Sequence, residues 1–374
     1  MQSPVLTAEA PSRNPREFDA TTADIPPVPH RTGHLKFVRR LAAMVSLMVV
    51  VDHSIVPPPG GIRGPSQIDD VLQVLAPFFQ LINMPVFFFM AGLLFAHSHG
   101  VTSLAPSVDL IQAKARRLVV PYWAISSLAF PVKCLLSRYA LRPVTWSWQS
   151  YFVTLVYPWA NTIVFYWFLL TLFLMFFVAP GLQWLSRRAP PAAKWAMTVV
   201  LVALFVNFDP GSHEYVSLLN WTGVLHYVLL FWFGIVLYPY VVGVSESNQS
   251  RRALLRGFAL LGSSLILYQV LPVNSLWGLL VLNSLGIATM TNFAIGTQAK
   301  ANRLLDLVGR NTYQIFLFSW FFHHAVILLS KRLTRLPIGL LELMSLCLGV
   351  LGPIGIAHIV RKIRQPRIQM LAGM

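Results

Sequence analysis

Long apolar segments separated by short polar loops repeat along the chain from about residue 37 to residue 360. Most come close to the roughly 20 apolar residues that a helix needs to cross a bilayer. The pattern predicts an all-α, polytopic membrane bundle of about ten helices. The predicted segments are 38–57, 72–96, 118–137, 162–185, 195–208, 219–241, 253–272, 276–296, 312–330 and 338–360. The fifth is short, and residues 150–160, which Pro158 interrupts, predict an interfacial or re-entrant piece.

The two ends of the chain are more polar than the segments between them. Residues 1–36 are rich in Pro, Ser, Thr and Ala, which predicts a disordered cytoplasmic tail before a membrane domain over 37–361 and a short cytoplasmic tail over 362–374. Cytoplasmic loops carry an excess of Lys and Arg. With the N-terminus inside, 22 of the 29 basic residues fall on the inner side and 6 in outer loops. We therefore expect both ends at the cytoplasmic face.

Composition narrows the class of protein. Hydrophobic residues make up 56% of the chain and charged residues only 11%, whereas soluble domains carry about 25% charged residues. The net charge of +16 is spread between the apolar segments. This spread is typical of membrane orientation signals rather than of a nucleic-acid surface. The lipid bilayer, and not nucleic acid, is the expected partner.

The first apolar segment ends in two ionisable residues, Asp52 and His53, and follows Arg39 and Arg40. On a helix His53 lies about 20 Å beyond Arg40. An ionisable side chain at that depth is costly, so function is the default hypothesis for it. Imidazole can take a proton from a hydroxyl near neutral pH. The alternative is a buried histidine that only hydrogen-bonds a neighbouring helix.

Asp52 is the second catalytic candidate, but its place beside His53 does not make the two a pair. Adjacent helical positions point about 100° apart and do not face one site. We therefore expect Asp52 to bind another helix, with Arg63 as a candidate partner.

Three cations, Lys114, Arg116 and Arg117, stand at the inner mouth of the third segment. Lys114 and Arg117 are three residues apart and share a helix face. Such a fork of cations suits a phosphate-bearing substrate, for example a nucleotide thioester. The alternative is ordinary membrane anchoring, because the other inner loops are basic too.

Four further residues are candidates for substrate contact: Asn83, Trp167, Ser319 and His323. Ser319 and His323 are four apart and could share a face of the ninth segment. The adjacent histidines His323 and His324 could be metal ligands, but no third ligand stands at a fixed spacing from them. We therefore expect no metal site.

These stretches resemble the acyltransferase 3 family of integral-membrane enzymes, which modify polysaccharides and other surface molecules. The first segment, RRLAAMVSLMVVVDHS, is similar to the family's first span, which follows a basic residue and ends in a histidine. The family's "MPxFFxxSG" stretch, its R-x-x-R element before "LxxPY", its "WFL" and its late "G-x-x-S-x-x-I-Y-x-x-H" span are similar to Met84–Gly92, Lys114–Tyr122, Tyr166–Leu169 and Gly309–Ser319.

Several positions depart from these motifs. Ala91 replaces a serine, Lys114 replaces the first arginine, and Ser319 stands where the late histidine is usual. The missing histidine leaves His53 as the main candidate base and weakens any scheme with two histidines.

The resemblance implies transfer of an acyl group to a hydroxyl of an exopolysaccharide or surface glycan, with cellulose among the candidates. The expected group is acetyl, and the expected acyl-CoA donor is acetyl-CoA. It also implies the bacterial inner membrane and a polysaccharide synthase complex as a candidate partner. In this interpretation Lys114, Arg116 and Arg117 hold the donor's phosphates and His53 deprotonates the acceptor. The alternatives are a transporter or flippase of a saccharide or lipid-linked intermediate, and a non-catalytic membrane subunit of a synthase.

Overall fold

The computed structural model describes nine stretches of the chain, namely residues 36–55, 67–98, 104–137, 143–208, 217–247, 249–271, 275–330, 336–363 and 365–374. The predictions made for residues 1–35 and for Arg63 lie outside this part of the chain.

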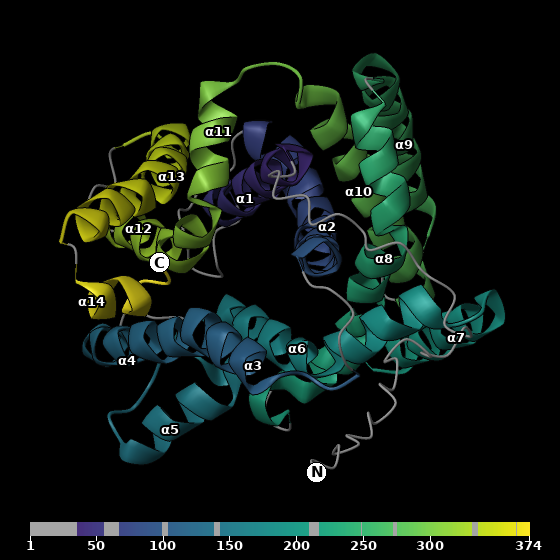
Figure 1. The fold of residues 1–374 in the computed structure, drawn as a ribbon. Helices are drawn as coiled ribbons and strands as arrows, with labels where there is room; N and C mark the ends of the chain where they lie inside the picture. Colours follow the sequence, from purple (N-terminus) through teal and green to yellow (C-terminus); the bar gives the residue numbers. More distant parts are fainter. Residues whose placement is uncertain are drawn as a thin grey trace, which may run out of the picture. The chain divides into compact units, whose positions relative to one another are not determined.

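The described stretches form helices, so the predicted all-α class is confirmed (Figure 1). The helices are α1 (Lys36–Ile55), α2 (Gln67–Ser98), α3 (Val108–Lys114), the π-helix η1 (Ala115–Val119), α4 (Val120–Leu135), α5 (Trp148–Val156), α6 (Trp167–Arg188), α7 (Pro191–Asn207), α8 (Trp221–Glu246), α9 (Ser250–Val270), α10 (Leu276–Thr297), α11 (Arg303–Arg310), α12 (Thr312–Ser330), α13 (Ile338–Ile363) and α14 (Pro366–Leu371), with 3₁₀ turns η3 (Pro158–Ala160), η4 (Val164–Tyr166) and η5 (Leu218–Asn220).

The chain is a polytopic helical membrane protein. Within the described residues, eight helical segments are long and apolar enough to cross a bilayer. The first and fifth predicted segments correspond to α1, which has 20 residues and two arginines, and to α7, which has only 17 residues. The interrupted stretch before the fourth segment forms the short helix α5 and the turn η3.

Helix α1 is central to the packing of the bundle. It contacts α2, α10, α11, α12 and α13. In Figure 1, α1 and α2 lie between the α12–α13 pair on one side and the α8–α10 group on the other. The side chains of Leu41, Val45 and Val49 are buried along α1. The helix that carries Asp52 and His53 is therefore packed inside protein over most of its length.

Glycines allow α2 and α8 to pack with their backbones in contact. A Cβ atom at Gly92 would collide with the carbonyl of Phe231, and one at Gly234 would collide with the carbonyl of Phe89. Small residues at membrane helix interfaces permit this close approach, which increases van der Waals contact where no hydrophobic effect drives association.

We expect Gly234→Ala to lower the free energy of unfolding by about 1–3 kcal/mol, because the added methyl group must push two helix backbones apart. Gly243 on the same helix is the matched control, since a Cβ atom there has no heavy atom within 4 Å. Gly243→Ala should be neutral or stabilising, because alanine favours helix by about 1 kcal/mol over glycine. Denaturation midpoints in one detergent check both variants. Equal midpoints for the two variants would contradict the close contact.

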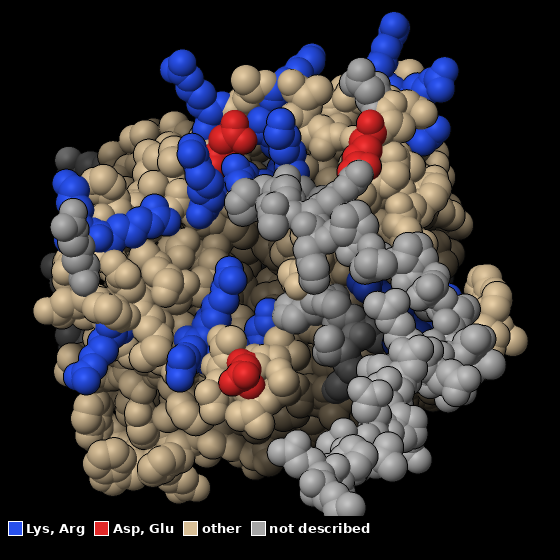
Figure 2. All heavy atoms as spheres, viewed as in Figure 1, with Lys and Arg blue, Asp and Glu red and all other residues tan. Residues whose placement is uncertain are grey.

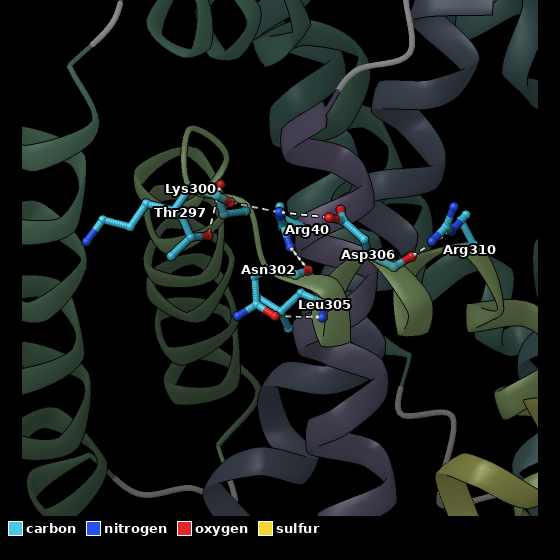
Figure 3. Close-up of polar contacts among 8 residues, drawn as sticks. Arg40, Thr297, Lys300, Asn302, Leu305, Asp306 and Arg310 are labelled. Atoms are coloured by element: carbon cyan, nitrogen blue, oxygen red, sulfur yellow. Dashed lines mark hydrogen bonds and ion pairs between the residues drawn. The ribbon is translucent and has the colours of Figure 1, made fainter.

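Arg40 ties α1 to the connection between α10 and α11 (Figure 3). Its Nη1 donates to the carbonyl of Asn302 at 3.0 Å, and its Nη2 donates to the carbonyl of Lys300 at 2.9 Å and to Asp306 Oδ2 at 3.3 Å. The guanidinium is 6% exposed and the carboxylate is 38% exposed. Five donors in a planar fork suit this set of three acceptors. Arg40 therefore stabilises the packing of α1 against the α10–α11 connection.

Candidate active site

Asp52 and His53 lie together near the C-terminal end of α1. Asp52 Oδ2 is 3.2 Å from His53 Nδ1, and Asp52 Oδ1 accepts a hydrogen bond of 3.1 Å from Gln80 Nε2 on α2. The expectation that adjacent positions keep these two side chains apart is wrong. The angle between neighbouring Cβ directions does not fix the ring nitrogen, because rotation about the side-chain bonds brings Nδ1 back to the carboxylate.

The carboxylate and the imidazole differ in exposure. Asp52 is buried, whereas the His53 side chain is 31% exposed. A buried carboxylate beside Nδ1 favours the tautomer with a proton on that nitrogen. The Nε2 lone pair of His53 is then the atom able to accept a proton from a substrate.

A second histidine borders this pair. The ring of His323 on α12 lies edge-on to that of His53, with ring centroids 6.1 Å apart. Its Nδ1 is 2.7 Å from Ser345 Oγ on α13. Its Nε2 is buried and has no hydrogen-bond partner among the described residues. A Cβ atom at Gly349 would collide with the Cε1–Nε2 edge, so the ring is held between α13 and His53.

The structure brings a second histidine to His53, although Ser319 stands where the motif has its late histidine. This residue is His323, one helical turn after Ser319 on α12. The predicted weakness of a scheme with two catalytic histidines stays a prediction. Ser319 itself is buried in α12. Its predicted contact with substrate stays a prediction.

A cationic cavity of about 970 Å³ opens at the opposite end of α1 from His53. It is lined by six basic residues from five segments of the chain: Arg39, Lys114, Arg116, Arg117, Arg310 and Arg361. In Figure 2, Lys and Arg side chains lie around a hollow in this face of the molecule. Their mutual repulsion favours a bound polyanion, so the site is suited to a ligand with several phosphates.

Local structure positions the three cations found from the sequence. Arg116 and Arg117 lie on the π-helix η1, between α3 and α4. Single turns of π-helix are rare in proteins, and many of those that occur lie at functional sites. Lys114 Nζ lies 4.3 Å from the centre of the Phe176 ring, and the carbonyl of Arg117 accepts a hydrogen bond from the hydroxyl of Tyr313. The Arg117 guanidinium also lies over the Tyr313 ring, which orients this part of the wall.

Aromatic rings lie between His53 and the end of the cationic cavity that is deepest in the bundle. Phe168 and Phe316 belong to the cavity lining, and the Phe316 and Phe165 rings are 5.6 Å apart. Phe165 is in turn 5.4 Å from the ring of His53. One half-buried phenyl ring therefore lies between the end of the cavity and the catalytic candidate.

Two predicted substrate residues are not brought to this pair by any contact. Trp167 stacks between Trp159 and Tyr227 at ring distances of 5.2 Å and is buried there. Asn83 is buried on α2, one turn from Gln80, and its Oδ1 has no hydrogen-bond partner among the described residues. Within the described residues no group of three His, Cys, Asp or Glu side chains could hold a metal ion.

The comparison with known families identifies the class of protein to which this chain belongs. A family model described as an acyltransferase domain matches residues 41–360, which is most of the chain. The chain belongs to the acyltransferase 3 family. It is therefore an acyltransferase. No curated protein and no solved structure shows a significant match. The transporter and the non-catalytic subunit, which the sequence left open, are set aside by this membership.

Sequence reasoning missed half of the cations in the cavity of this acyltransferase. Arg39, Arg310 and Arg361 are separated by up to 322 positions along the chain and gather only in the folded bundle. Gln80 and Ser345, which contact Asp52 and His323, were also missed. No signal in a single sequence distinguishes them from ordinary polar residues of membrane helices.

Proposed function

We propose that this acyltransferase moves an acetyl group from acetyl-CoA to a hydroxyl of a surface glycan or exopolysaccharide. The observation that carries the proposal is the cationic cavity, whose inner end lies one aromatic ring from the Asp52–His53 pair. A donor with several phosphates and a thioester at the end of a long arm matches such an arrangement.

The cations hold the nucleotide end of the donor. Arginine forks bind phosphate oxygens in a bidentate manner, whereas a lysine acts as a point charge. Lys114 at the end of α3 provides one wall together with Arg116 and Arg117 of η1. The other cations of the lining are Arg39, Arg310 and Arg361. The thioester arm then runs along the edge-to-face pair of Phe168 and Phe316, whose ring centroids are 5.5 Å apart, toward Phe165. The Phe165 ring turns aside to admit the acyl group to His53.

His53 acts as the general base. Its Nε2 takes the proton of the acceptor hydroxyl while the oxygen attacks the thioester carbonyl. The new C–O bond forms as the C–S bond breaks, and the proton passes from His53 to the departing thiolate of CoA. Asp52, held by Gln80, keeps Nδ1 protonated and stabilises the imidazolium that forms.

His323 has a supporting role in this proposal. Its ring borders His53, while Ser345 and Gly349 hold it from α13. These contacts favour positioning of the His53 ring over direct contact with substrate. Asn83 and Trp167 stay proposed substrate residues, although among the described residues neither shares a hydrogen bond or ring contact with Asp52 or His53.

The acceptor class rests on the resemblance of the chain to enzymes that modify polysaccharides. Cellulose, the bacterial inner membrane and association with a polysaccharide synthase are the narrower forms of the same proposal. Purified protein in liposomes, given acetyl-CoA with a labelled acetyl group and soluble oligosaccharides, tests it. We expect label in base-labile esters on the oligosaccharide. Release of CoA with no hydroxyl acceptor labelled, across glycans of several linkages, would contradict the glycan assignment.

We expect Arg117→Ala to weaken acetyl-CoA binding roughly 10- to 100-fold, because hydrogen bonds to charged groups contribute about 1.5–3 kcal/mol. Binding of acetyl-pantetheine, which lacks the nucleotide, should not change. Arg188→Ala, which removes an exposed cation outside the cavity lining, is the matched control. Titration of the three proteins with both ligands measures this. An equal loss for both ligands would reject the phosphate role of Arg117.

A further inference from the structure

A second cavity lies on the side of the bundle formed by α7, α8, α9 and α10. This lateral pocket has a volume of about 660 Å³, within the range of ligand sites in proteins. Its lining is mostly apolar and includes two cations, Lys194 and Arg256. It shares no residue with the cationic cavity.

The length of the lateral pocket matches one leaflet of a bilayer. On α10 the lining runs from Ser284 to Ile295, a rise of about 16 Å at 1.5 Å per residue. The hydrocarbon core of a bilayer is about 30 Å thick, so one leaflet contributes about 15 Å. A fatty-acid chain of ordinary length fills such a space.

Both cations of the lateral pocket lie at its membrane-surface end. Lys194 is in the first turn of α7 and Arg256 in the second turn of α9. The lining toward this end also includes Val244 and Ile295, near the C-terminal ends of α8 and α10. The apolar part of the lining extends from there toward Phe89 and Phe233. Charge at one end and apolar surface over the remaining length is the polarity of an anionic lipid.

The pocket opens at the same membrane face as the cationic cavity. Helices α2 and α8 run parallel, because Phe88 stacks on Tyr227 while His97 contacts Tyr238 further along both helices. The cationic cavity reaches Ser98 at the end of α2, and the lateral pocket reaches Val244 near the end of α8. Both sites therefore meet the same leaflet.

Two exposed aromatic side chains mark the headgroup level of a lipid in this pocket. Trp195 and Tyr240 line it and are 71% and 68% exposed, as expected of aromatic side chains at the level of lipid headgroups.

We propose that the lateral pocket binds one anionic phospholipid, with its phosphate between Lys194 and Arg256 and one acyl chain along α8 and α10. The proposal is independent of the proposed function, because none of its residues belongs to the cationic cavity or to the Asp52–His53 pair.

Native mass spectrometry of the full chain in neutral detergent, titrated with phosphatidylglycerol or phosphatidylcholine, tests the proposal. We expect tighter retention of phosphatidylglycerol, and roughly 30-fold weaker retention in the double variant Lys194→Ala/Arg256→Ala, since each basic residue near a membrane surface contributes about a factor of five. Arg188→Ala/Arg251→Ala, which removes the same charge outside the lining, should bind as wild type does. Acetyl-CoA binding should be unchanged in both double variants.

Two further variants keep the result decisive. Ala288→Trp fills the pocket and should remove the retained lipid while both cations remain. Arg117→Ala should leave it in place, because that residue lines the other cavity. Equal retention of the two lipids, loss of phosphatidylglycerol in Arg117→Ala alone, or equally tight binding of glycerol phosphate without acyl chains would each overturn the assignment.

Discussion

Replacing His53 by alanine should lower the rate of acyl transfer by about 10²–10⁴-fold, the contribution that a positioned general base makes to a rate. The hydroxyl of a sugar is a poor nucleophile until it loses its proton. The His53 side chain, which pairs with Asp52, is 31% exposed, and Phe165 lies between it and the cationic cavity. The loss should fall on kcat, because the proposed phosphate site lies at the other end of α1. Single-turnover transfer of labelled acetyl groups measures it.

Two companion variants separate catalysis from folding. Asp52→Asn keeps the shape of the side chain and its contact with Gln80, yet removes the charge that favours an Nδ1 proton and the imidazolium. We expect a smaller loss of kcat than in His53→Ala, with donor affinity unchanged. His324→Phe retains a ring stacked on Trp320 and should leave activity near the wild-type level. Wild-type transfer by His53→Ala would end the assignment of this residue as the base.

The membrane helices could be predicted from the sequence for a physical reason. A segment inside lipid must satisfy its backbone hydrogen bonds internally, so nearly every long apolar run becomes a helix. The predicted segment 312–330 coincides with α12, and 276–296 differs from α10 by one residue. The first and fifth predicted segments are not among the eight helices that are long and apolar enough to cross a bilayer. Helix α1 carries two arginines, and α7 has only 17 residues.

The candidate site could be predicted only in its local parts. Lys114, Arg116 and Arg117 are close in sequence, so their shared face follows from helix geometry. Arg39, Arg310 and Arg361 come from distant segments, and each resembles an ordinary anchoring residue. Their convergence depends on tertiary packing around α1. No periodicity of the chain encodes that packing.

The error about Asp52 has a similar origin. Helical angles describe where the Cβ atoms point, but the Asp52–His53 contact joins atoms further out on both side chains. Gln80 of α2 restrains the carboxylate in this orientation. His323 was chosen for its spacing from Ser319, whereas its relation to His53 required α12 to pack beside α1. Side-chain rotation and the packing of separate helices are what sequence reasoning lacked.

Replacing Arg40 by alanine should lower the free energy of unfolding by about 2–4 kcal/mol, while its neighbour Arg39 should matter for donor binding instead. Breaking a buried ion pair costs about 3–5 kcal/mol. Here the cost is smaller because Asp306 is 38% exposed and can be solvated. Two carbonyls, those of Lys300 and Asn302, also lose their donor. Thermal or denaturant unfolding in detergent measures the change.

Arg39 provides the matched control, since it has the same charge, on the same helix, one residue away. It lines the cationic cavity and makes none of the contacts of Arg40 with the α10–α11 connection. Arg39→Ala should therefore keep the unfolding midpoint and weaken acetyl-CoA binding, whereas Arg40→Ala should lower the midpoint and bind the donor normally wherever it is folded. Arg40→Lys should recover only part of the stability, because one ammonium cannot reach three acceptors at the angles of a planar fork. The reverse pattern, with Arg40 governing the donor and Arg39 the fold, would show that the cavity wall has been assigned to the wrong arginine.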